Sequence, residues 1–191
     1  KEAVCVVFEK VNTGGKALDA FELITAMYAA EDYQLRDDWY GTEGHEGLAQ
    51  RFRVEGKAHY AKAGILADVS NTDFLHVISL FHTRDVRRIA IEAGKTDKEL
   101  PQITGKRQAL LSLPLSAYKQ YKDKAELGFK RAAQFVHQLH IFRTYDLPYQ
   151  SQLIPLAAVL ADLDKVWEHA EKYKKLKRWF WNGVFGELYG S

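Results

Sequence analysis

Three things are scarce in this sequence: cysteine, net charge and long hydrophobic runs. The single cysteine, Cys5, excludes an internal disulfide bond and favours a reducing, cytoplasmic setting. It stands in an apolar stretch, where a small buried residue is a more typical role than a nucleophile. No run reaches the length of a transmembrane helix, and no signal peptide is evident, so we expect no membrane association.

The low net charge limits what the protein can bind. Lys and Arg number 27 against 25 for Asp and Glu, which leaves a formal charge of +2. A chain without an overall basic field has no long-range attraction for nucleic acid. Any contact with nucleic acid therefore has to come from a local patch.

Helical periodicity dominates the rest of the sequence. It predicts an all-α fold, an irregular multi-helix bundle with long loops and little or no strand. Because the chain starts at Lys1, without methionine and within a patterned segment, we expect residues 1–191 to form a single helical domain of a larger protein. Residues 94–107, with a proline, two glycines and many charges, are predicted to form a mobile loop.

Two capping boxes locate helix starts. Asp19 with Glu22, and Ser70 with Asp73, each place an N-cap acceptor three residues before a carboxylate that can reach back to the cap amide. Ser116 is a third expected N-cap. The expected helices cover residues 2–11, 19–30, 70–93, 116–142, 153–163 and 163–180, with short helices joined by loops over 31–69.

The first candidate site is the glycine turn at Asn12, Thr13, Gly14, Gly15 and Lys16. Its glycines could free backbone amides for a phosphate, with the lysine supplying charge. It lacks the glycine spacing and the following Ser or Thr of a Walker A loop. A turn between two helices explains every residue and is the favoured interpretation.

The second candidate is a basic run near the C-terminus, which could contact phosphates or stack bases. The alternative, and the more common meaning of a charge run, is a solvated helix face whose apolar residues pack inside. The run comprises Lys172, Lys174, Lys175, Lys177 and Arg178, interleaved with the aromatic residues Tyr173, Trp179 and Trp181.

Other chemistry is weakly indicated. His137 and His140 share a helix face and could seat a metal, but no nearby residue completes a ligand set. A third ligand would have to come from a distant segment, such as His76 or His82, so we predict no metal site and no metal or other cofactor held by this chain. No nucleophile and base occur at a recognisable catalytic spacing. We therefore assign no catalytic residue.

Several segments resemble the GmrS-like (GmrSD-type) bacterial restriction proteins, whose full-length members begin with a ParB-like domain. The segments are spread along the whole chain in one order, which indicates collinear similarity rather than one shared motif. They are residues 7–26 (VFEKVNTGGKALDAFELITA), 73–80 (DFLHVISL), 110–118 (LLSLPLSAY), 128–142 (GFKRAAQFVHQLHIF), 146–160 (DLPYQSQLIPLAAVL) and 177–191 (KRWFWNGVFGELYGS).

The resemblance implies that this chain is the helical region that follows the ParB-like domain. In that family the ParB-like domain carries an Asp-Gly-Gln-Gln-Arg motif linked to nucleotide hydrolysis, and some relatives carry or partner with an HNH nuclease. Neither motif occurs here. The resemblance therefore implies nucleotide triphosphate and magnesium only for a full-length protein, with the ParB-like domain, a nuclease and DNA as partners.

Three functions remain open from the sequence. The first is a scaffold that couples a ParB-like domain to DNA or to a nuclease in defence against foreign or modified DNA. The second is a nucleotide-binding enzyme domain that uses the turn at Asn12–Lys16. The third is a structural bundle for homo-oligomerisation through C-terminal aromatic residues, which are Trp179, Trp181, Phe185 and Tyr189.

Overall fold

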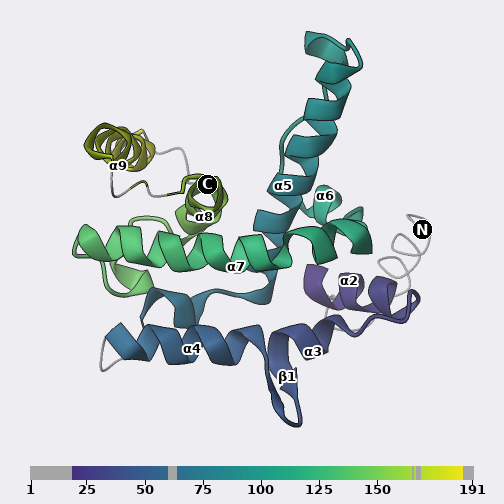
Figure 1. The fold of residues 1–191 in the computed structure, drawn as a ribbon, viewed down its shortest axis with the longest axis horizontal. Coiled ribbons are helices and arrows are strands. Elements are labelled where there is room, and N and C mark those ends of the chain that lie inside the picture. The colour runs from purple at the N-terminus through teal and green to yellow at the C-terminus, as the bar shows by residue number, and fades with distance from the viewer. Residues whose placement is uncertain (1–18, 60–63, 165, 167–168, 187–191) are drawn as a thin grey trace. The chain divides into compact units, whose positions relative to one another are not determined.

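The computed structural model describes residues 19–59, 64–164, 166 and 169–186 (Figure 1). Within these residues the chain forms eight α-helices, four short 3-10 helices and one sheet of two two-residue strands. The predicted all-α class with little strand is therefore confirmed. The helix expected over residues 2–11 and the turn at Asn12–Lys16 lie outside the described residues.

The chain divides into two compact units. Unit 1 comprises Lys1–Arg51 and Ser70–Lys122, and unit 2 comprises Phe52–Val69 and Asp123–Ser191. Two helices, α4 (Leu48–His59) and α7 (Leu115–Gln138), contribute residues to both units. That residues 1–191 form a single domain stays a prediction.

In unit 1, α2 (Ala20–Ala29) packs against α3 (Leu35–Tyr40), α5 (Asn71–Glu92) and α6 (Arg107–Leu111). A short hairpin follows α3, in which β1 (Gly41–Thr42) pairs antiparallel with β2 (His45–Glu46). The 3-10 helix η2 (Asp97–Glu99) lies between α5 and α6. Side chains buried in this unit include Phe21, Ile24, Tyr28, Leu35, Phe74, Ile78 and Leu113.

Both predicted capping boxes are confirmed. Asp19 accepts a 2.8 Å hydrogen bond from the Glu22 amide, and the Glu22 carboxylate accepts one of 2.9 Å from the Asp19 amide. Ser70 and Asp73 repeat the exchange at 3.0 and 3.1 Å. These bonds satisfy backbone donors that the first turn of a helix would otherwise leave unpaired, and they explain why α2 and α5 begin where the sequence predicts.

The connection after α5 turns at Gly94, whose φ of +82° is in the left-handed region, and returns alongside α5 (Figure 1). Side chains of α5 then hold its backbone. Arg87 Nη1 donates to the Pro101 carbonyl at 2.9 Å, and Thr83 accepts from the Thr104 amide at 3.0 Å. Residues 101–104 are thus tied to one face of the helix, while the mobility expected of residues 94–107 stays a prediction.

Unit 2 gathers its helices around a second core. It contains η1 (Ile65–Asp68), η3 (Thr144–Asp146), η4 (Gln150–Gln152), α8 (Leu153–Asp162) and α9 (Ala170–Phe185), besides its parts of α4 and α7. The ring of Phe52 packs against that of Phe129, with centroids 6.0 Å apart. Further buried side chains are Phe135, Val136, Leu156, Leu160 and Phe180.

The predicted N-cap of α7 lies two residues too late, and its predicted end lies four residues too far along the chain. The Pro114 carbonyl accepts from the Tyr118 amide at 3.2 Å, so the helix begins at Leu115 and Ser116 lies inside its first turn rather than at the N-cap. At the other end His140 adopts a φ of +63°, and the Ile141 amide bonds the Val136 carbonyl at 3.0 Å. This closing pattern is that of a Schellman motif, which ends the helix at Gln138.

The prediction for the last helix was also displaced. It covers Ala170–Phe185 rather than residues 163–180. The reason lies at the end of α8, where Arg131 Nη1 donates to the Leu160 carbonyl at 3.0 Å and Nη2 pairs with Asp164 at 2.9 Å. An arginine that binds free carbonyls at a helix C-terminus stabilises the stop, because the cation offsets the negative end of the helix dipole.

In unit 2, α7 and α8 approach each other closely at Gly128. A Cβ atom at Gly128 would lie 2.4 Å from the Ala157 carbonyl oxygen and 3.1 Å from the Ala161 Cβ. Glycine within a helix ordinarily weakens it. Here the missing side chain is what lets the two backbones pack together.

We therefore expect Gly128→Ala to destabilise the protein, against the intrinsic preference of helices for alanine. Overpacking against a backbone oxygen typically costs about 1–3 kcal/mol, and the roughly 1 kcal/mol by which alanine favours a helix offsets part of this cost, which leaves a net loss of up to about 2 kcal/mol. Urea unfolding followed by circular dichroism measures the difference. The matched control is Gln134→Ala on the exposed side of α7, where we expect a change within about 0.5 kcal/mol. A stabilised Gly128→Ala protein would contradict the packing described.

Candidate nucleic-acid interface

The basic run predicted near the C-terminus lies on α9, and one face of that helix is buried. Tyr173, Leu176, Phe180 and Gly183 follow one another at spacings of three, four and three residues, which places them on a single face of an α-helix. Leu176 is 5% exposed and Phe180 is fully buried. The sequence thus dictates which side of α9 packs inside unit 2.

Two contacts hold that face in place. The ring of Phe180 meets that of Phe135 edge to face, with centroids 5.7 Å apart and planes at 70°. The buried side chain of Gln152 donates from Nε2 to the Phe180 carbonyl at 2.8 Å. The first contact fixes the helix by its side chains and the second by its backbone, so rotation of α9 about its own axis would break both.

The cations of α9 lie away from this buried face. All five predicted side chains are exposed, and among the residues that the structure describes none of them makes an ion pair. Some cations of unit 2 are neutralised instead, such as Lys130, which contacts Glu55 at 2.6 Å and Glu126 at 2.9 Å. The exposed set is Lys172, Lys174, Lys175, Lys177 and Arg178.

Part of the set forms a stripe with two aromatic side chains. Lys174, Arg178, Trp181 and Phe185 follow at spacings of four, three and four residues, so they line one face, nearly opposite the buried one. The rings of Trp181 and Phe185 are stacked, with centroids 6.0 Å apart and planes at 26°. Phe185 is 80% exposed. This stripe is called the α9 stripe below.

The aromatic residues that lie beside the cations in the structure differ from those that the sequence predicts. Tyr173, expected among them, is half-buried with its ring 5.7 Å from that of Phe135, and burial raises the pKa of its hydroxyl. Trp179 is 37% exposed and lies outside the stripe. Phe185, which the sequence suggested only for oligomerisation, joins the cations because α9 extends five residues beyond its predicted end.

The remaining sequence candidates do not form a site in the described part of the chain. Asn12, Thr13, Gly14, Gly15 and Lys16 lie outside it. His137 and His140 contact the edge of Phe142, with centroids 4.7 and 6.2 Å away, and His140 takes part in ending α7.

The described residues as a whole lack two further features. No group of three or more His, Cys, Asp or Glu side chains is placed to hold a metal ion. No helix there combines the length and the apolar character that crossing a membrane requires.

Sequence reasoning missed a polar network in unit 1 centred on Asp38. Its Oδ2 accepts from Tyr33, from the Tyr118 hydroxyl at 3.0 Å and from Lys122 Nζ at 3.0 Å. Burial alone would raise the pKa of Asp38, but these hydrogen bonds and the lysine charge together lower it. Partners some 80 residues apart carry no local sequence signal.

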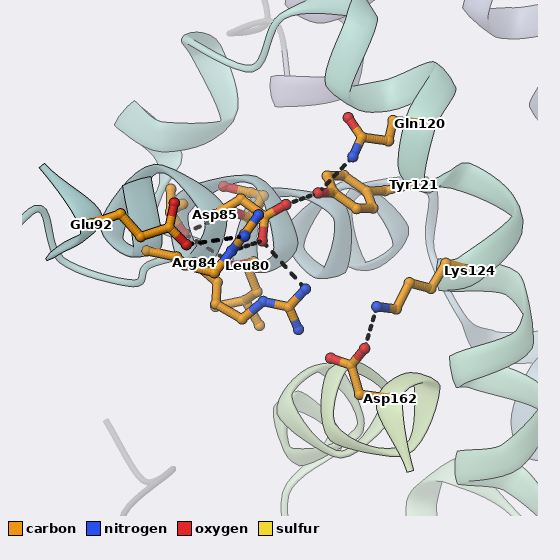
Figure 2. Close-up of polar contacts among 11 residues, drawn as sticks. Leu80, Arg84, Asp85, Glu92, Gln120, Tyr121, Lys124 and Asp162 are labelled. Atoms are coloured by element: carbon orange, nitrogen blue, oxygen red, sulfur yellow. Dashed lines mark hydrogen bonds and ion pairs between the residues drawn. The ribbon is translucent and has the colours of Figure 1, made fainter. Parts of the chain in front are cut away.

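A second network of unit 1 joins α5 to α7 (Figure 2). Tyr121 donates to Asp85 and accepts from Gln120 Nε2 at 2.9 Å, while Arg84 lies 3.5 Å from the same carboxylate. The hydrogen bond from Tyr121 is the main reason that the pKa of Asp85 is lowered, and burial with this bond raises the pKa of Tyr121 to about 12. Lys124 and Asp162, also drawn in Figure 2, pair within unit 2. In each network the charges satisfy one another.

Comparisons of the chain with family models, with curated proteins and with solved structures found no match.

The Asp38 network predicts a specific response to acid. A carboxylate whose pKa is lowered by folding stabilises the folded state above its unfolded pKa of about 4, and that stability is lost as the pH falls through the folded value. We expect Asp38→Asn to lower the melting temperature at pH 7. The difference in melting temperature between this variant and the parent protein should narrow between pH 5 and pH 2. Thermal melts across this range provide the measurement.

Asp123→Asn is the matched control, since Asp123 is an exposed carboxylate on α7. This variant should follow the parent protein at every pH. If the difference in melting temperature between Asp38→Asn and the parent protein stays constant down to pH 2, the charge of Asp38 contributes nothing to the stability of the folded protein.

Proposed function

We propose that this chain is a helical interaction module of a nucleotide-dependent bacterial restriction protein, and that it contacts the nucleic-acid backbone through α9. The collinear resemblance to the GmrS-like proteins supports the first part. The second part rests on one observation, the five exposed cations of α9 that make no ion pair within the described residues.

Several cations elsewhere in the described residues are paired with carboxylates, whereas the five on α9 are exposed and close together in the sequence. Lys122 and Lys130 each contact a carboxylate within 3.0 Å, and Arg131 pairs at 2.9 Å. On α9 the only acid in the first turn is Glu171, which precedes five positive charges within seven residues. Such a surface attracts polyanions, because each phosphate it neutralises releases condensed counterions.

The helix itself has dimensions that suit a nucleic acid. A helix with its side chains is about 10–12 Å across, which the major groove of duplex DNA admits, and its positive face can also lie along a single strand. Contacts of this kind set affinity and position but carry little sequence information. The proposal therefore concerns attachment to nucleic acid and leaves recognition of a modification to other parts of a full-length protein.

The test reverses the charge of Lys174, Lys175 and Arg178 to glutamate. We expect affinity for a fluorescent oligonucleotide at low salt to fall about tenfold or more, which is roughly 1.4 kcal/mol or more. Each lost phosphate contact should also reduce the slope of log K against log salt by about 0.7 for a single strand and 0.9 for a duplex. Fluorescence anisotropy over a salt titration measures both quantities.

A second triple variant supplies the control, with glutamate at Lys95, Lys98 and Lys106, which are exposed cations of unit 1. It makes the same change in net charge away from α9, and we expect a smaller loss of affinity and an unchanged slope. Equal losses in the two variants would mean that only net charge matters. A stable dimer by light scattering, with no nucleic-acid binding, would support the structural oligomerisation module instead.

The family part of the proposal has its own test. The coding sequence upstream of Lys1 should specify a ParB-like domain with an Asp-Gly-Gln-Gln-Arg motif. A reading frame without it would argue against the family.

A further inference from the structure

The two aromatic residues of the α9 stripe, Trp181 and Phe185, are connected to the core of unit 2 by a series of ring contacts. Four rings are in contact one after another, from the core of unit 2 to its surface. Phe135 meets Phe180 at 5.7 Å, Phe180 meets Trp181 at 5.3 Å, and Trp181 meets Phe185 at 6.0 Å. The last ring in this series is 80% exposed, whereas Phe135 and Phe180 are fully buried.

The orientation of the rings changes along the series. The inner contacts are edge to face, with planes at 70° and 83°, but Trp181 and Phe185 are stacked at 26°. A stacked pair with an open outer ring can be extended by another flat ring on the same axis. We call the stacked pair of Trp181 and Phe185 the aromatic platform. Because Phe180 contacts Trp181 from the core side, this platform is in place before a ligand binds, which lowers the entropy cost of binding.

The platform continues the line of the cations. At about 1.5 Å of rise per residue, Arg178 and Phe185 lie roughly 10 Å apart along α9, on the same face. Lys174 lies one turn earlier on that face. A chain that carries both phosphates and flat rings could therefore place its phosphates on the cations and one ring on Phe185.

We propose that the α9 stripe selects single-stranded over duplex nucleic acid by stacking an unpaired base on Phe185. This inference rests on the proposed binding of nucleic acid by α9 and names the form of nucleic acid that is bound. Bases inside a duplex have both faces covered by their neighbours, whereas a single strand offers free base faces. Stacking of a base on an aromatic side chain tolerates any sequence, since every base has such a face.

The experiment compares three probes of equal length: a 16-nucleotide oligo-dT, an abasic strand with the same phosphates, and a duplex. The parent protein should bind oligo-dT more tightly than the abasic strand by about 5- to 100-fold, the usual effect of one stacked base. It should also prefer oligo-dT to the duplex. An oligo-U probe tests whether RNA serves equally well.

Two substitutions separate stacking from mere apolar contact. Phe185→Leu keeps an apolar side chain against Trp181 but has no aromatic face, and it should abolish the preference for oligo-dT over the abasic strand with no change in salt slope. Phe185→Tyr keeps the ring and should retain the preference. Phe185 is exposed at the end of α9, so both variants should melt at the temperature of the parent protein.

The outcomes distinguish this inference from the proposed function. Equal affinity for oligo-dT and the abasic strand, or tighter binding of the duplex, overturns single-strand selection, and the phosphate contacts of α9 would stand. Loss of the preference in Phe185→Tyr as well as in Phe185→Leu would also overturn stacking. No binding of any probe at low salt overturns the proposed function itself.

Discussion

The orientation of α9 depends on the burial of Phe180. Its ring packs on Phe135 and its carbonyl accepts from Gln152, so the helix is held by one face at its middle. When one face of an α-helix is buried, the helix geometry fixes which residues lie on the opposite, exposed face. Lys174, Arg178 and Phe185 are directed outward because Leu176 and Phe180 are directed inward. The core of unit 2 thus decides which residues of α9 are exposed.

The charges of this protein fall into two groups with different consequences. In unit 1, Asp38 is shared by two tyrosines and Lys122, and Asp85 by Tyr121 and Arg84. Such networks use their charges to join distant segments of one chain, and little is left over for a ligand. The cations of α9 make no ion pair in the described part of the chain. The protein as a whole carries a net charge of only +2, whereas α9 places five cations within seven residues after a single acid, Glu171.

Local chemistry explains which parts of the fold could be predicted. The capping boxes at Asp19 and Ser70 need only residues three apart, and both helices begin as expected. The end of α7 and the start of α9 were misplaced because they depend on distant or unusual features, namely Arg131, which binds a carbonyl 29 residues away, and a left-handed His140. A solvated helix face that carries the five cations could be predicted from neighbouring residues alone, and the five side chains are exposed. The sequence associated Phe185 only with oligomerisation. Its position on the same face as Arg178 could not be predicted, because it depends on where α9 ends.

The most direct test of the central claim is photo-crosslinking of a bromodeoxyuridine oligonucleotide to the protein, followed by tryptic digestion and mass spectrometry. Trypsin cuts after Arg178, and residues 179–191 contain no further cleavage site, so one peptide contains both Trp181 and Phe185. If α9 is the interface and bases stack on Phe185, this peptide carries the dominant crosslink. Crosslinks concentrated in other peptides, with residues 179–191 unmodified, would contradict the assignment of nucleic-acid binding to α9.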